Sequence, residues 1–103
     1  MTAKKMDPVH PGEIIQKDIL EPLEMSQNQL ARALNVPPRR INEIVLGKRR
    51  ITADTALRLA KFLGTSAEVW MNVQTRYDLD VTEDAIRDKI EKEIKPLEHD
   101  EAA

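Results

Sequence analysis

The chain has 103 residues, 41% of them hydrophobic and 33% charged, and a formal net charge of −2. These values fit one small domain, and no stretch approaches the roughly 18 consecutive apolar residues that a membrane-spanning helix needs. The absence of cysteine excludes disulfides and cysteine-ligated metal sites, and residues 1–6 lack the apolar run of a signal peptide, so we expect a cytoplasmic protein without a membrane partner.

The first predicted helix follows a loose arm over residues 1–10. Pro11 opens it, because proline suits the first turn of a helix, and Pro22 is expected to end or bend it near Leu20. Its expected apolar stripe consists of Ile14, Ile15, Ile19, Leu20 and Leu23. His10 has no cysteine or second nearby histidine to work with, so we expect a structural role for it in the loop before the helix.

Two short helices joined by a tight turn are predicted next. Ser26 and Gln29 form a capping box that starts a helix running to about Leu34, and Pro38 takes the first position of a helix that Gly47 closes. The residues that these helices are expected to bury are Leu30, Ala31, Leu34, Ile41, Ile44 and Val45. Such a pair is either a plain helical hairpin or a helix-turn-helix.

Three further helices complete the predicted pattern. Thr52 caps one that ends at Gly64, Ser66 caps a second that reaches Tyr77, and Thr82 caps a third. The apolar residues that the first two carry are Leu57, Ala60, Phe62, Leu63, Val69, Trp70 and Val73. We expect Trp70 and Phe62 to be core residues.

The last predicted helix has an apolar stripe whose partner the sequence leaves open. The stripe consists of Ile86, Ile90, Ile94 and Leu97, and it could pack on its own domain, cross to a second protomer or contact another protein. The expected fold is therefore all-α, with five helices in a domain over residues 11–80 and an additional helix within an acidic C-terminal segment over residues 81–103. His99, in this acidic tail, indicates no specific role.

The middle of the chain is basic, although the whole chain is slightly acidic. Residues 25–64 include eight basic and two acidic residues, whereas residues 78–103 include ten acidic and four basic ones. A basic segment of this kind could bind phosphates, or it could be only a solvated face.

Three features of this segment favour a helix-turn-helix that reads double-stranded DNA. The second helix of the pair has an outward face of residues that can bond base edges in the major groove, namely Arg39, Arg40, Asn42 and Glu43. The loop after Gly47 has three cations that could bind phosphate, namely Lys48, Arg49 and Arg50. The start of the first helix offers Ser26 and Gln27 for another phosphate.

These features also have plainer interpretations. The cations of residues 48–50 could be a solvated loop, and Arg39 and Glu43 are four residues apart, as in an exposed helical ion pair. No nucleophile with a nearby base, no metal-binding cluster and no phosphate-binding loop is visible in the sequence, so we expect no enzyme, no catalytic residue and no cofactor.

Five stretches of the chain together resemble one known family. The stretches 10–14, 23–34, 36–49, 51–60 and 70–74 are similar to the HigA antitoxins, or VapI-like plasmid-maintenance antidotes, of the Xre/Cro helix-turn-helix superfamily. The resemblance implies a five-helix lambda-repressor-like domain that binds a palindromic operator as a homodimer and represses its own operon. It also implies a HigB-type toxin partner, an mRNA endoribonuclease that the antitoxin neutralises.

The resemblance also suggests which residues contact bases. The recognition helix corresponds to residues 38–46, and the family's base-contacting positions fall here on Pro38, Arg39 and Glu43. Because proline cannot donate a hydrogen bond, we expect the contacts to shift toward the residues beside it, so that the candidate base readers are Pro38, Arg39, Arg40, Asn42 and Glu43. The candidate phosphate contacts are Ser26, Gln27, Lys48, Arg49 and Arg50.

Two positions depart from the family pattern. Relatives often have a small polar residue in place of Arg39, a difference that could change the operator sequence, and asparagine in place of Leu46, a difference that could weaken a local contact. Two other hypotheses stay open at this point. One is an orphan Xre-type repressor without a toxin, and the other is a module whose basic face binds an acidic protein.

Overall fold

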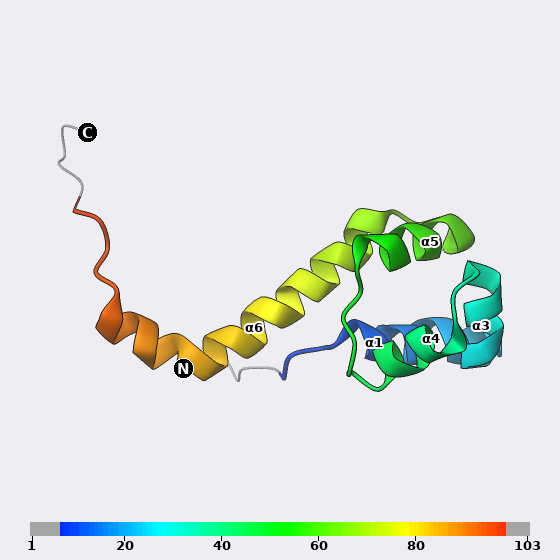
Figure 1. Cartoon of the computed structure of the whole chain (residues 1–103), viewed down its shortest axis with the longest axis horizontal. Helices are drawn as coiled ribbons and strands as arrows, with labels where there is room; N and C mark the ends of the chain where they lie inside the picture. Colours follow the sequence, from blue (N-terminus) through cyan, green and yellow to red (C-terminus); the bar gives the residue numbers. More distant parts are fainter. Residues whose placement is uncertain (1–6, 99–103) are drawn as a thin grey trace.

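All regular structure in the computed structural model, which describes residues 7–98, is helical (Figure 1). The elements are α1 (Pro11–Ile14), the π-helical turn η1 (Ile15–Leu20), α2 (Glu21–Leu23), α3 (Gln27–Leu34), α4 (Pro38–Val45), α5 (Ala53–Leu63) and α6 (Ala67–Glu93). Because α1, η1 and α2 follow one another without a break, they form the first of five helices, and the predicted all-α fold is confirmed. Of the expected arm, residues 7–10 have no regular structure, while residues 1–6 and His99 lie outside the described part.

Pro22 was expected either to end or to bend the first helix near Leu20, and the helix does not end there. The backbone widens into a π turn instead, in which the N–H of Glu21 donates to the carbonyl oxygen of Gln16. This i to i+5 pattern carries the helix past the proline. The extra residue in the turn shifts the buried face, so that Leu20 is 2% exposed and Leu23, predicted to be in the stripe, is 53% exposed.

The local signals for the next two helices are confirmed. Ser26 and Gln29 form the complete capping box at the start of α3, and Asn35 ends it in the left-handed conformation with φ of 58°. All predicted core positions of the pair are buried except Val45, which is partly buried; the buried set is Leu30, Ala31, Leu34, Ile41 and Ile44.

The first helix lies directly against the backbone of α4. A Cβ atom added to Gly12 would lie 1.9 Å from the carbonyl oxygen of Ile44, far inside any real contact. Gly12 is therefore what lets α1 approach α4 this closely, and the position of α4 depends on this contact.

His10 holds the start of the first helix and contacts α6. It is 7% exposed, and its Nδ1 accepts a hydrogen bond of 2.9 Å from the N–H of Gly12. Its ring meets that of Tyr77 edge to face, with centroids 4.8 Å apart. The structural role expected for His10 is thus confirmed.

Acidification is expected to destabilise the fold through His10. Burial lowers the pKa of His10 below its ordinary value of 6.5, although the charges of Asp78 and Glu13 partly oppose the shift. Below that value the unfolded chain binds a proton that the folded chain resists, so the free energy of unfolding should fall as the pH drops below about 6.5. Urea titrations at pH 7.5 and pH 5.5 should show that the free energy of unfolding falls less in His10→Asn than in the unaltered protein. Asparagine keeps a capping acceptor but does not titrate in this range. An equal loss in both proteins would contradict this assignment.

The helices α5 and α6 are only partly as predicted. Trp70 is buried at 4% exposed, but Phe62 is 42% exposed, so the prediction that it is a core residue was wrong, and Leu57 is 62% exposed. α5 turns a different face inward, with Thr55, Ala56 and Leu59 at helical spacing.

The helix predicted to start at Thr82 is not a separate element. α6 is one helix of 27 residues, and Thr82 lies in its interior. No glycine or proline interrupts residues 78–82, and α6 runs on across the expected boundary after residue 80. Figure 1 shows this second half extending away from the rest of the protein.

The apolar stripe of this second half does not pack on its own domain. Ile86, Ile90, Ile94 and Leu97 are between 36% and 78% exposed. Because α6 ends at Glu93, with Ile94 in an extended conformation, the placement of Ile94 and Leu97 in the helical stripe was wrong. Of the three possibilities that the sequence leaves open, packing on its own domain is therefore excluded. None of the described helices combines the length and the apolar character that crossing a bilayer requires.

Candidate nucleic-acid interface

Glu43 and two arginines form the exposed centre of the surface formed by α4 and the loop after it. The side chain of Arg39 is 82% exposed, and its Nε donates to Glu43 Oε2 over 2.8 Å. Arg49 donates to the other carboxylate oxygen of Glu43 over 2.9 Å. The hydrogen bonds from Arg39 and Arg49 lower the pKa of Glu43, so this carboxylate is ionised at neutral pH. The exposed i, i+4 ion pair considered for Arg39 is thus present in the chain without DNA.

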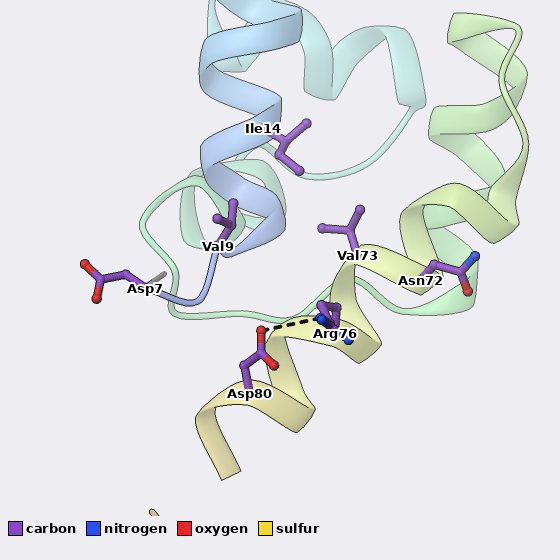
Figure 2. Close-up of a pocket in the computed structure, with 7 residues that line it drawn as sticks. All are labelled: Asp7, Val9, Ile14, Asn72, Val73, Arg76 and Asp80. Atoms are coloured by element: carbon purple, nitrogen blue, oxygen red, sulfur yellow. Dashed lines mark ion pairs between the residues drawn. The ribbon is translucent and has the colours of Figure 1, made fainter. Parts of the chain in front are cut away.

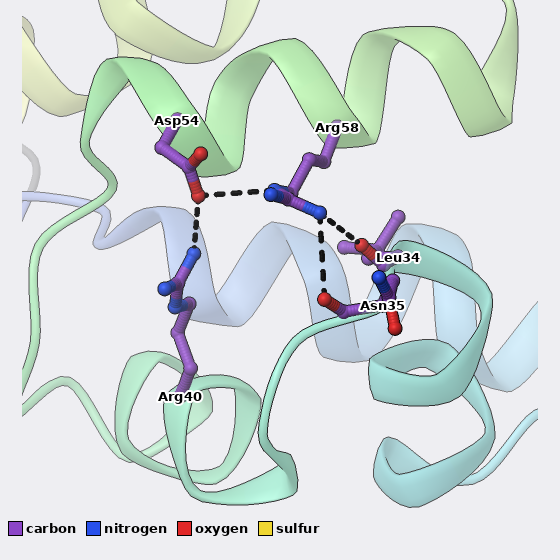
Figure 3. Close-up of polar contacts among 5 residues, drawn as sticks. All are labelled: Leu34, Asn35, Arg40, Asp54 and Arg58. Atoms are coloured by element: carbon purple, nitrogen blue, oxygen red, sulfur yellow. Dashed lines mark hydrogen bonds and ion pairs between the residues drawn. The ribbon is translucent and has the colours of Figure 1, made fainter.

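Arg40 points toward α5, where it meets a second carboxylate (Figure 3). Its Nη1 pairs with Asp54, which also accepts from Arg58 Nε over 3.1 Å. Arg58 in turn donates to the carbonyl oxygens of Leu34 and Asn35, over 2.9 and 3.4 Å. These bonds tie the end of α3 and the first turn of α4 to α5. The pKa of Asp54 is lowered chiefly by its bond from Arg40 and then by that from Arg58.

Asn42 links the two helices of the helix-turn-helix. Its Nδ2 donates to Gln27 Oε1 over 2.6 Å, in a partly buried position. Ser26 is occupied by the capping box, since its Oγ accepts from the N–H of Gln29 over 3.0 Å. The hydroxyl still has its own hydrogen to donate, so Ser26 can cap the helix and bond a phosphate oxygen at the same time.

The loop after α4 is fastened to α6 through a buried amide. Gln74 is 1% exposed, and its Oε1 accepts from the N–H of Ile51 over 2.6 Å. Its Nε2 donates to Asp78 Oδ1 over 2.9 Å, and Arg50 pairs with Asp78 Oδ2 at 2.5 Å. The bond from Arg50 is the main reason that the pKa of Asp78 is lowered. Lys48 is exposed.

The sequence reasoning missed the three residues that fasten this surface to α5 and α6. Asp54, Gln74 and Asp78 had no assigned role, although one signal was present. Trp70 is followed at steps of four by Gln74 and Asp78, so all three share one face of α6. A polar residue one turn after a core tryptophan indicates a buried hydrogen bond.

A groove of about 700 Å³ lies between the first helix and α6 (Figure 2). Its lining residues are Asp7, Val9, Ile14, Asn72, Val73, Arg76 and Asp80, with Arg76 and Asp80 paired at 3.6 Å. It shares none of these residues with the basic surface. Within residues 7–98 no group of His, Asp and Glu residues has the arrangement of a metal site.

The chain is similar to known helix-turn-helix proteins. A family model described as Helix-turn-helix matches residues 16–70. Virulence-associated protein I of Dichelobacter nodosus is 52% identical over 79 residues, which cover 77% of this chain and 73% of that protein. Antitoxin HigA-1 of Vibrio cholerae is 33% identical over 97 residues, 94% of this chain and 90% of that protein. The structure of Pseudomonas aeruginosa antitoxin HigA with the higBA promoter superposes with a TM-score of 0.86 at 44% identity, covering 88% of this chain and 99% of that one.

Proposed function

Because the chain belongs to the Xre-type helix-turn-helix family and, within it, to the HigA antitoxins, we propose that it represses its own operon and neutralises a HigB-type mRNA endoribonuclease. It binds a palindromic operator as a homodimer, acts in the cytoplasm and catalyses no reaction. The observation that supports DNA binding most strongly is the exposed, arginine-bearing face of α4 in a fold that a promoter-bound HigA shares. Two copies on half-sites one helical turn apart would add their few base contacts.

In this proposal α4 enters the major groove and reads bases with its exposed face. The base-contacting residues are Pro38, Arg39, Arg40, Asn42 and Glu43. Arg39 is the most exposed side chain among the ion pairs of α4 and can offer two donors to a guanine. Arg40 and Asn42 have protein partners in the free chain, so each must exchange that partner for a base.

Phosphate contacts on either side of α4 set its register on the duplex. Their residues are Ser26, Gln27, Lys48, Arg49 and Arg50. Ser26 and Gln27 lie at the N-terminus of α3, where free N–H groups favour an anion. The three cations begin three residues after the end of α4, at the far end of the same helix-turn-helix.

The Arg39→Ala variant is expected to bind operator DNA more weakly by about 1–3 kcal/mol and to lose its preference at one base position. Fluorescence anisotropy with the DNA upstream of the operon, and with a scrambled duplex of equal length, measures both effects. Arg87→Ala is a matched control, because Arg87 forms the same kind of i, i+4 pair with Glu83 outside the helix-turn-helix. If the unaltered protein showed no operator preference at moderate salt, the proposed DNA reading would be wrong.

A toxin partner can be tested separately from DNA binding. Purification of the native complex from cells that carry the whole operon should yield a second, small basic protein, and this chain should suppress its mRNA cleavage. Recovery of this chain alone, without a toxin gene beside its own, would favour an orphan Xre-type repressor. Competition by DNA of unrelated sequence would separate both from a module that binds an acidic protein.

A further inference from the structure

We propose that Asp54 and Asp78 are built-in counter-anions of the DNA-binding surface. In the free chain each pairs with one arginine of this surface, Asp54 with Arg40 and Asp78 with Arg50, and the arginine is released only when DNA takes the place of the carboxylate. The inference rests on the proposed DNA binding and adds a determinant to it. These two acids limit how tightly the chain binds DNA of any sequence.

Asp78 is held in place opposite Arg50 by the protein itself. Gln74 bonds both the Asp78 carboxylate and the N–H of Ile51, the residue directly after Arg50. Gln74 is buried, and its own position is fixed on the same face of α6 as the core residue Trp70. The Gln74 amide therefore fixes the Asp78 carboxylate beside Arg50.

Asp54 has an equivalent arrangement beside Arg40. It lies in the first turn of α5 and also accepts from Arg58, which is anchored on the last carbonyl groups of α3 (Figure 3). The carboxylate thus stands over the first turn of α4, the turn that the proposed function places in the major groove. Neither acid comes from α4 or its loop, so both pairs join separate elements.

Both pairs are weak enough to be exchanged for DNA. The side chains of Arg50 and Asp78 are 53% and 41% exposed, and those of Arg40 and Asp54 are 27% and 53% exposed. Exposed pairs of this kind contribute little to stability, because water screens them. A base at Arg40 or a phosphate at Arg50 can therefore replace the carboxylate. Breaking the pair subtracts from the binding free energy, and the carboxylate left behind repels the DNA backbone.

The test is the affinity of Asp78→Asn for a duplex of unrelated sequence at constant salt near 0.1 M. We expect binding about two- to fivefold tighter for each protomer than that of the unaltered protein. The matched control is Asp80→Asn, which removes the same charge from the same helix but from a residue that pairs with Arg76. In the Arg50→Ala background, Asp78→Asn should tighten binding no more than Asp80→Asn does, because the arginine that it releases is absent and only the removed charge remains.

The outcomes separate this inference from the proposed function. If the unaltered protein binds the operator but Asp78→Asn leaves affinity for unrelated DNA unchanged or lowers it, the inference is wrong and the function stands. An equal gain in Asp80→Asn, or a gain of undiminished size without Arg50, also overturns it, because net charge alone would then explain the effect. If the unaltered protein binds no DNA, the proposed function fails. Asp54→Asn, tested with and without Arg40→Ala, repeats the measurement should Asp78→Asn not fold.

Discussion

The Gly12→Ala variant is expected to lose about 3 kcal/mol of unfolding free energy or more, and operator binding with it. Helix propensity alone would predict the opposite sign, since alanine is favoured over glycine within a helix by about 1 kcal/mol. The new Cβ, however, would lie 1.9 Å from the carbonyl oxygen of Ile44, an atom of the α4 backbone that no rotamer change can move aside. Either α1 or α4 must shift, and α4 is the proposed reading helix. Urea denaturation and operator anisotropy measure the two effects.

Gly64→Ala is the matched control for this substitution. Gly64 ends α5 with φ of +73°, and no atom from elsewhere in the fold lies within 4 Å of a Cβ placed there. Its replacement should cost only the strain of a left-handed alanine, about 1 kcal/mol, and leave operator binding unchanged in the folded protein. If Gly12→Ala were as stable as the unaltered protein, or no less stable than Gly64→Ala, the close approach of α1 to α4 would be wrong.

Local signals in the sequence predicted most of the fold, because the interactions behind them span few residues. The capping box at Ser26 and the left-handed Asn35 depend on neighbours within one turn, and both are confirmed. The hydrophobic periodicity did not show that the first helix passes Pro22 through a π turn and does not end there. Nor did it show that α6 continues through Thr82, because one long helix and two shorter ones have the same periodicity. Which face of α5 is buried depends on what packs against it, so the exposure of Phe62 could not be read from its apolar character.

The candidate site divides in the same way. The sequence predicted the residue types on α4 and in the loop after it, since they are consecutive and their spacing follows from the helix. Apart from the Arg39–Glu43 pair, it did not predict their partners. Arg40 meets Asp54 across 14 positions, and Arg50 meets Asp78 across 28. Such pairs follow from tertiary packing, which is why the sequence suggested free cations where the structure has paired ones. Whether these side chains contact DNA stays a prediction.

Gln74→Leu is the second substitution with a large expected effect, about 3 kcal/mol of unfolding free energy. Leucine has a similar size but no polar atom, so the buried N–H of Ile51 loses its acceptor and Asp78 loses a donor. A buried donor without a partner costs about 1–3 kcal/mol, and the two lost bonds add to that. Loss of the amide also frees the loop that carries Lys48, Arg49 and Arg50, the proposed phosphate contacts.

Hydrogen exchange distinguishes this cause from a general loss of packing. In Gln74→Leu the amide of Ile51 should exchange faster than the amides of α5, whereas a cavity or clash in the core would lower protection throughout. Thr75→Leu is the control, because it introduces the same side chain one position along α6, where the residue is exposed. If the Ile51 N–H stayed protected while the variant remained folded, the Gln74 side-chain amide would be dispensable for holding the loop. The loop would then be held by its other contacts, namely the buried Ile51 side chain and the Arg49–Glu43 and Arg50–Asp78 pairs.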